Sequence, residues 1–207
     1  MSKEQWEMKP GKGLGYLGFG MNQLDAKAFD HLYGNSVNTK TYGKSADTIL
    51  ENLGPFANFF SDAVKTLALD DTNKFDTETA GLVEETRNPG CYLRLDYWHG
   101  NLRAFTVDMD CIELRIQDFY IFNTEPRNTL FFLQQLNGRA IANEFDVIYE
   151  KLGIRLTAFH YQNASGAWRY FTNTDDFFGA RFVTLFDPEN VEKYLDRNFI
   201  EVDFTTR

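Results

Sequence analysis

The chain has 207 residues, a formal net charge of −9 and an aromatic content of 16%. A chain of this length fits one domain, or two small lobes that share a core. The negative charge argues against a nucleic-acid or anionic-membrane partner, because the protein would repel phosphates. It suits a basic protein partner, whose opposite field would speed association, although acidity can also serve solubility alone. The many aromatic residues predict either a Phe-rich core or aromatic side chains displayed for contact.

The first ten residues and the two cysteines indicate the compartment. Residues 1–10 carry several charges and no apolar run of the kind that an export signal contains. No stretch of the chain approaches the roughly 20 apolar residues that a membrane-spanning helix needs. Cys91 and Cys111 are too few for a disulfide scaffold, so reduced thiols are the simplest account, and a bond between the two stays open. We therefore expect a cytoplasmic protein.

The first predicted element is a helix over residues 23–33. Asn22 stands where a helix N-cap would, and Asp25 lies in the first turn, where a negative charge is favourable. Gly34 follows as a stop signal. A glycine-rich stretch, residues 11–20, precedes this helix and predicts an edge strand or a tight turn.

Further helical patterns follow in the first half of the chain. A helical stretch begins near Ser45 and is interrupted at Gly54-Pro55, because a helix usually ends before the residue that precedes proline. Apolar residues then recur at helical spacing and predict an amphipathic helix over 56–68. Residues 70–85 are strongly acidic and predict a polar loop, which the turn signal Pro89-Gly90 closes.

From Cys91 the apolar pattern changes to a period of two. Residues 91–98, 102–109 and 112–119 predict a three-stranded antiparallel meander. A helix is then expected from Pro126 to Asn137-Gly138, since proline is favoured in the first turn of a helix and glycine just beyond its end.

The second half repeats this order of elements. Four strands are predicted, over 145–149, 154–161, 168–171 and 180–186, and a last helix runs from Pro188 to about Arg197. We therefore predict an α+β fold of antiparallel sheets with packed helices. Its helix-plus-meander organisation occurs twice, in one domain whose two lobes, about 1–122 and 123–207, share a core.

No motif in the chain predicts a cofactor or a metal. The letters Gly-x-Gly-x-x-Gly at 13–18 follow a charged segment instead of a strand, and Gly43-Lys44-Ser45 lacks the first glycine of a phosphate-binding loop. The acids of 70–85 do not have calcium-loop spacing. The histidines are isolated in sequence and show no zinc spacing; they are His31, His99 and His160. An enzyme whose site assembles only in space stays an alternative.

The segment 161–171 has the composition of a binding surface. It combines small residues with Trp168, Arg169 and Tyr170, and these three residue types dominate binding hot spots. Asp175 and Asp176 follow directly. The same residues also fit a plain β-hairpin whose aromatic side chains are half buried, and both interpretations stay open.

The opening of the chain resembles a recurrent bacterial start. Residues 15–22 read GYLGFGMN and continue into the predicted helix that stops at Gly34. A Phe-Gly-Met turn followed by a capped helix is similar to small α+β modules of the outer-membrane-assembly lipoprotein type. Acidic cytoplasmic chains with this start and two α+β lobes resemble immunity proteins of bacterial polymorphic-toxin and type VI secretion effector systems. Asn22 stands where those proteins usually carry Ser or Thr, and the lipid-attachment cysteine of the lipoproteins is absent.

The resemblance implies a protein that binds a cognate toxin and blocks its active site. Many such toxins are basic nucleases, so acidic residues would steer the encounter and aromatic residues would anchor it. Oligomeric state is left open, and the alternatives are a small cytoplasmic enzyme or an adaptor without a toxin partner. The candidate partner-binding residues are Asp70, Asp71, Asp76, Glu78, Glu84, Glu85, Trp98, Tyr161, Trp168, Arg169, Tyr170, Asp175 and Asp176.

Overall fold

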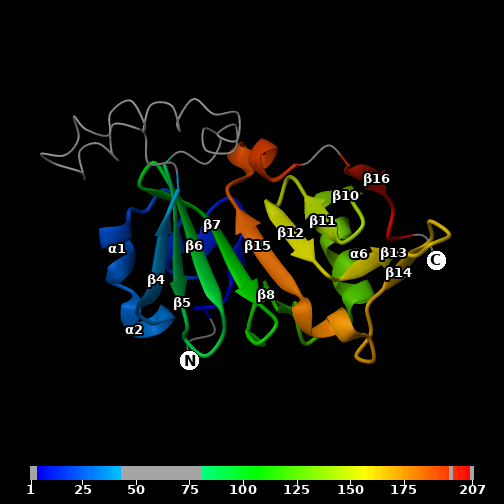
Figure 1. The fold of residues 1–207 in the computed structure, drawn as a ribbon, viewed down its shortest axis with the longest axis horizontal. Coiled ribbons are helices and arrows are strands. Elements are labelled where there is room, and N and C mark those ends of the chain that lie inside the picture. Colours follow the sequence, from blue (N-terminus) through cyan, green and yellow to red (C-terminus); the bar gives the residue numbers. More distant parts are fainter. Residues whose placement is uncertain (1–3, 43–80, 196–197, 206–207) are drawn as a thin grey trace, which may run out of the picture.

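The computed structural model describes residues 4–42, 81–195 and 198–205 (Figure 1). The helices predicted from Ser45 and over 56–68, and the predicted loop residues 70–80, lie outside the described residues. None of the helices in the described part is both long enough and apolar enough to span a bilayer.

One nine-stranded antiparallel sheet organises the structure. Its strands, in spatial order, are β16 (Ile200–Val202), β10 (Ala140–Ala142), β11 (Asp146–Tyr149), β12 (Ile154–Thr157), β15 (Phe182–Phe186), β7 (Asn101–Asp108), β6 (Leu93–Trp98), β5 (Leu82–Arg87) and β4 (Ser36–Thr41). The neighbours β7 and β15 lie far apart in sequence, and their pairing joins the two halves of the chain into one sheet. The predicted α+β class with antiparallel sheets is thus confirmed.

The remaining elements are short. The strands β1 (Met8–Lys9), β2 (Gly13–Leu14) and β3 (Leu17–Gly18) form a small sheet; β8 (Arg115–Ile116) pairs with β9 (Phe119–Tyr120), and β13 (His160–Gln162) with β14 (Trp168–Tyr170). The helical elements are α1 (Gln23–Lys27), α2 (Asp30–Tyr33), α6 (Pro126–Asn137), η3 (Asp176–Ala180) and η4 (Pro188–Tyr194). Helices α1 and α2 lie at one end of the main sheet and the β13–β14 hairpin at the other (Figure 1).

The two faces of the main sheet differ in chemistry. Strand alternation sends apolar side chains, such as Leu95, Phe105 and Leu156, into the core beneath α6 and the small β1–β3 sheet. The contact between the sheet and α6 also includes a hydrogen bond, because the buried Tyr149 hydroxyl donates to the backbone oxygen of Leu130 at 2.7 Å. The opposite face carries polar and charged side chains along its middle, so the sheet has a core face and an open face. The open-face residues used below are Glu84, Arg94, Asp96, Thr106, Asp146, Arg155 and Thr184.

The predicted helix 23–33 is present but divided. Its start is confirmed, since the Asn22 side chain accepts a hydrogen bond from the Asp25 amide at 2.9 Å. Phe29 has non-helical dihedral angles, and this break separates α1 from α2. The Phe29 ring stacks on the Tyr16 ring. Gly34 ends α2 with a φ of 75°, a conformation that glycine adopts without strain.

Two predictions in the first half, one loop and one strand, are wrong. Residues 82–85 belong to β5 and not to a loop, because this segment pairs with β6 along its whole length. Its two acids lie on opposite faces of the strand, Glu84 on the open face and Glu85 on the core side. Residues 112–119 do not form a third meander strand. The positive φ of Gln117, 56°, breaks the segment between β8 and β9. These two strands form their own hairpin.

The second half follows its predictions more closely. Helix α6 has the predicted bounds, with Pro126 in its first turn and Gly138 in the left-handed conformation after its end. The predicted strand 154–161 divides at Ala158, whose φ is 60°, and the chain then leaves the main sheet to form β13. The last predicted helix is the 3₁₀ element η4, whose first turn is capped by Asp187.

Candidate functional site

The β13–β14 hairpin carries most of the predicted binding residues. Its register pairs His160 with Tyr170, Tyr161 with Arg169, and Gln162 with Trp168. The connecting turn is ordered by one side chain, because the Asn163 carboxamide oxygen accepts hydrogen bonds from the amides of Ser165 and Ala167 at 3.1 and 2.9 Å. The hairpin is therefore a defined surface feature.

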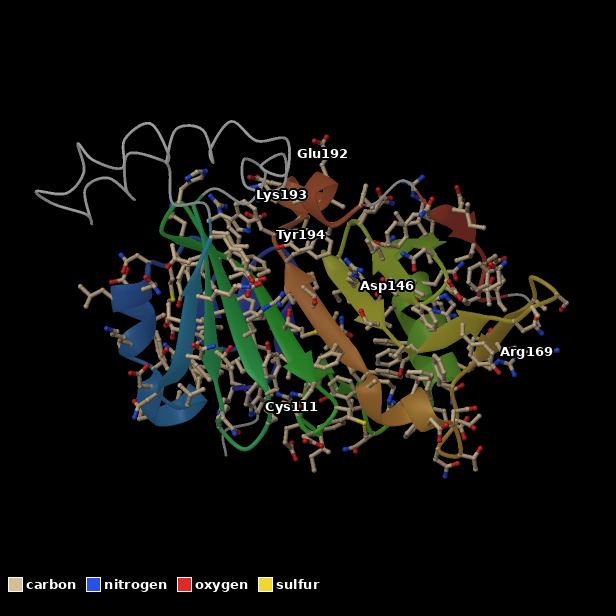
Figure 2. The ribbon with its side chains drawn as sticks, in the orientation of Figure 1. Cys111, Asp146, Arg169, Glu192, Lys193 and Tyr194 are labelled. Atoms are coloured by element: carbon tan, nitrogen blue, oxygen red, sulfur yellow. The ribbon has the colours of Figure 1, made fainter. Side chains whose placement is uncertain are left out.

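The two faces of the hairpin have different surroundings. On the inner face, the buried His160 ring lies 4.9 Å from the Trp168 ring and 5.7 Å from the Phe204 ring, measured between centroids. Burial lowers the pKa of His160 to about 4, so the ring is neutral and its Nε2 donates to the Asn143 oxygen at 2.9 Å. On the outer face Arg169 is exposed and extends away from the strand (Figure 2). The inner face holds the hairpin on the protein, but Trp168 and Tyr170 stay only half-buried, so a partner can meet their exposed parts as well as the outer face.

A cavity of about 550 Å³ lies between the hairpin and the start of α6. Its apolar walls are Phe122, Tyr170, Phe171 and Phe178, and the side chains of Arg127 and Arg169 also line it. The Arg127 guanidinium lies 5.8 Å from the centre of the Tyr170 ring, within reach of a cation–π interaction. The cavity thus combines aromatic surface with positive charge.

The start of α6 adds to the positive character of this cavity. This 12-residue helix has Glu125 at its N-cap position, and no side chain caps its first turn. The Thr124 hydroxyl is engaged elsewhere, since it donates to the Tyr120 oxygen at 2.7 Å. Uncapped amides at a helix N-terminus carry a partial positive charge that favours anions.

The structure also contains a second hollow, of about 470 Å³, on the open face of the main sheet. Arg94 and Arg155 line it from either side of the β7–β15 pair. Both arginines are already neutralised: Arg94 lies 2.9 Å from Asp96, and Arg155 lies 2.6 Å from Asp146. Burial raises the pKa of Asp96 to about 6. The charges of this hollow are therefore balanced within the protein.

The enzyme alternative would be favoured by a pocket that holds His99 or His160 beside a carboxylate. Neither histidine lines the hairpin cavity or the open-face hollow. Among the residues that the structure describes, no three His, Cys, Asp or Glu side chains are grouped so as to hold a metal ion.

The predicted site residues fall into separate regions. Asp70, Asp71, Asp76 and Glu78 lie outside the described residues. Tyr161, Trp168, Arg169 and Tyr170 come together in the hairpin, and Asp175 and Asp176 lie close by in sequence at the start of η3. The Asp175 carboxylate accepts from the Thr172 amide at 2.6 Å, and Thr172 lines the cavity.

The predicted residues on β5 and β6 lie away from the hairpin, beyond the β7–β15 pair. Glu84 is half-buried and lies 3.3 Å from Arg94. Glu85 is only 2% exposed and lies 2.7 Å from Arg87, so we leave it out of the binding surface. Trp98 is half-buried, with the Lys193 ammonium 3.8 Å from its ring centre.

Sequence reasoning missed the residues that complete the cavity. Phe122, Arg127 and the start of α6 lie about forty residues before the hairpin, and nothing in their local pattern links the two segments. A weak signal was present, because Arg127 has no acidic residue three or four positions away that could pair with it on a helix. Comparisons of the chain with protein-family models, with curated proteins and with solved structures gave no significant match.

Proposed function

We propose that this protein acts by binding another protein and, in line with the resemblance of its N-terminal segment, that it is an immunity protein that neutralises a cognate bacterial toxin. The observation that carries the proposal is the grouping of Tyr161, Trp168, Arg169 and Tyr170 in one ordered hairpin beside an aromatic cavity. Tyr, Trp and Arg are the residue types most enriched in binding hot spots.

Exposed apolar side chains near the hairpin support the proposal that this region is a binding surface. The Phe177 side chain is 62% exposed, and its ring contacts Phe171 of the cavity wall with the centroids 6.2 Å apart. Phe145, which is 44% exposed, lines a further hollow together with Trp168. Exposed apolar side chains next to hot-spot residue types are typical of a protein interface.

The overall charge suggests the character of the partner. A net charge of −9 would attract a basic protein and raise its association rate at low salt. A basic nuclease-type toxin has the opposite charge and would be attracted in this way. The acids that supply it are spread over the chain, and binding energy would come from the hairpin anchors, since rim charges mainly set the association rate.

We also propose that the fold is an internal repeat. In the first half, α1 and α2 precede the strands β4, β5, β6 and β7, which lie side by side in that order. In the second half, α6 precedes β10, β11, β12 and β15, which again lie side by side. The halves meet through their last strands, β7 and β15, in an antiparallel pair, as a two-fold axis through this pair would require.

Neutralisation of a toxin can be tested in cells. The purified protein is used to capture candidates from lysate of the source organism at low and high salt, and each candidate is then expressed alone and together with this protein. We expect one basic protein that is toxic alone and harmless when co-expressed. If the captured proteins include none whose toxicity is relieved, the immunity proposal is wrong.

The anchor residues can be tested once the partner is known. We expect the double variant Trp168→Ala/Tyr170→Ala, and separately Phe177→Ala, to weaken partner binding at least about tenfold, because buried aromatic anchors typically contribute about 2 kcal/mol each. Leu24→Ala is the matched control, since Leu24 is 76% exposed on α1 at the other end of the sheet. Unchanged affinity in the folded double variant would mean that the hairpin is not the anchor.

A further inference from the structure

The arginines that the structure describes differ in whether they form an ion pair. Five arginines in the described part of the chain lie within 4.0 Å of a carboxylate; they are Arg87, Arg94, Arg103, Arg139 and Arg155. Four others make no ion pair within the described residues: Arg115 on β8, away from the cavity, and Arg127, Arg169 and Arg181, which line the hairpin cavity or lie behind its wall. The chain has 30 acidic and 21 basic residues, so carboxylates outnumber cations, and three of these four unpaired arginines nevertheless lie at one cavity.

Arg181 lies directly behind the cavity wall. Its side chain is 1% exposed, and its guanidinium centre lies 3.9 Å from the Phe178 ring and 5.7 Å from the Phe122 ring, both of which line the cavity. Its Nε donates to the Phe178 oxygen at 3.0 Å, and its Nη1 has no hydrogen-bond partner. A buried cation without a counter-charge is costly, and its field extends through the low-dielectric wall into the cavity.

Two further contributions to the cavity have the same sign. Arg127 and Arg169 line it with exposed guanidinium groups, and the uncapped first turn of α6 forms part of its rim. Among the residues that line it, Glu125 is the single carboxylate; it is exposed at the rim and forms an ion pair with neither arginine. The lining thus holds two cations and one carboxylate, with Arg181 behind the wall, while the nearby Asp175 is engaged by the Thr172 amide.

We propose that this cavity receives a carboxylate group of the bound protein partner, held by Arg127 and Arg169 between the aromatic walls. The proposal rests on the proposed function and names the chemistry of its central contact. A planar guanidinium matches a carboxylate through two parallel hydrogen bonds. The aromatic walls suit an acidic residue that has an apolar neighbour. A nucleic acid is a poorer occupant, because the net charge of −9 repels a polyanion, whereas one carboxylate on a basic protein can enter.

The test uses two peptides of matched shape and needs no toxin. The ¹⁵N-labelled protein is titrated with N-acetyl-Phe-Glu-amide and with its neutral counterpart N-acetyl-Phe-Gln-amide, while the arginine Nε–H signals and the Thr172 amide are followed by NMR. We expect millimolar, saturable binding of the Glu peptide at these signals, at least tenfold tighter than binding of the Gln peptide. Inorganic phosphate is titrated separately, and we expect it to bind more weakly than the Glu peptide.

Variants assign the effect to the cavity. We expect Arg127→Gln/Arg169→Gln to bind both peptides equally weakly, and both side chains are exposed, so the variant should fold. Arg139→Gln is the control, because Arg139 is 52% exposed and pairs with Glu150 outside the cavity, and it should keep the preference for the Glu peptide. Equal binding of the two peptides by the unmodified protein, or tighter binding of phosphate, would overturn the proposal.

The two proposals can fail separately. A missing preference for the Glu peptide counts against the carboxylate site and leaves the co-expression result unaffected. A missing neutralisation in cells counts against the immunity function, while a preference for the Glu peptide would still support an anion-binding cavity. Once a neutralised toxin is found, unchanged affinity of the Arg127→Gln/Arg169→Gln variant for it would show that the cavity does not hold the partner.

Discussion

The hydroxyl oxygens of Thr106 and Thr184 lie 3.0 Å apart across the middle of the main sheet. Thr106 is on β7 and Thr184 is on β15, so this hydrogen bond crosses the pair of strands through which the two halves of the chain meet. The residues are 78 positions apart in sequence. The contact therefore reports directly on how the halves are joined, and it can be tested without knowledge of function.

We expect the two threonines to be energetically coupled. Either single variant, Thr106→Val or Thr184→Val, leaves the other hydroxyl without this partner on a face where Thr106 is only 8% exposed. The Thr106 hydroxyl then keeps only a long hydrogen bond, 3.5 Å, from Arg94. Replacing both threonines removes both hydroxyls together, so the double variant should be more stable than the sum of the single effects by about 0.5–1.5 kcal/mol. A double-mutant cycle by urea denaturation measures this coupling. Purely additive effects would show that this hydrogen bond contributes nothing to the stability of the β7–β15 pair.

The buried ion pair beneath α2 gives a larger expected effect. Arg87 is fully buried, with its Nε 2.7 Å from Glu85 and its Nη1 2.8 Å from Asp30. Arg87→Met would leave the Glu85 carboxylate buried without a counter-charge, so we expect a loss of about 3–5 kcal/mol in unfolding free energy. Adding Glu85→Gln should recover part of that loss.

The control for this pair is an exposed one. Arg139 pairs with Glu150 at the surface, and Arg139→Met should cost far less than Arg87→Met, because solvent screens such pairs. Chemical denaturation of the three variants gives the comparison. Equal losses for Arg87→Met and Arg139→Met would mean that burial does not amplify the Arg87 interaction.

Local signals predicted much of the fold. Pro126 and Gly138 marked both ends of α6, and Asn22 marked the start of α1, because each residue acts on the backbone of its own turn. The error at 82–85 has a different origin. The many acids of 70–85 predict a solvated loop. Glu85 and Arg87, however, are two positions apart and therefore lie on the same face of a strand, where they pair. The consecutive acids obscured the two-residue periodicity that is typical of a strand.

The candidate site was only half predictable. The hairpin was visible because Trp168, Arg169 and Tyr170 are adjacent in sequence. The cavity was not, because it forms where α6 begins beside the hairpin and needs Phe122 and Arg127 from an earlier segment. Such a contact depends on tertiary packing, which neither periodicity nor composition encodes.

We expect the two cysteines to be unreactive in the folded protein. Cys91 and Cys111 are free and buried, and a hydrogen bond with Cys91 together with burial raises the pKa of the Cys111 thiol well above its usual range (Figure 2). Only the thiolate is nucleophilic, so Ellman's reagent at pH 8 should react slowly with the native protein and rapidly with both thiols in guanidinium chloride. Rapid modification of either cysteine in the native protein would contradict the buried thiol pair.

We expect His160 to lower the free energy of unfolding as the pH falls. Burial lowers its folded pKa to about 4, while the hydrogen bond to the Asn143 oxygen and the neighbouring Asp146 oppose the shift. An unfolded histidine titrates near 6.5. Between these values the unfolded chain binds the proton and the folded protein does not. The contribution of His160 is therefore fully present above pH 6.5 and is lost as the pH falls toward 4, by about 2 kcal/mol between pH 7 and pH 5.

The variant His160→Gln isolates this contribution. Glutamine can still donate to the Asn143 oxygen that accepts from Nε2, but it does not titrate. We expect the variant to be less stable than the wild type at pH 7 and to lose about 2 kcal/mol less between pH 7 and pH 5.

The raised pKa of Asp96, about 6, acts in the opposite direction, because the folded protein then binds a proton that the unfolded chain has released. This effect is common to both proteins and cancels in the comparison. His31→Gln, at an exposed position on α2, is the control, and identical pH profiles for wild type and His160→Gln would show that His160 is protonated without cost in the folded state.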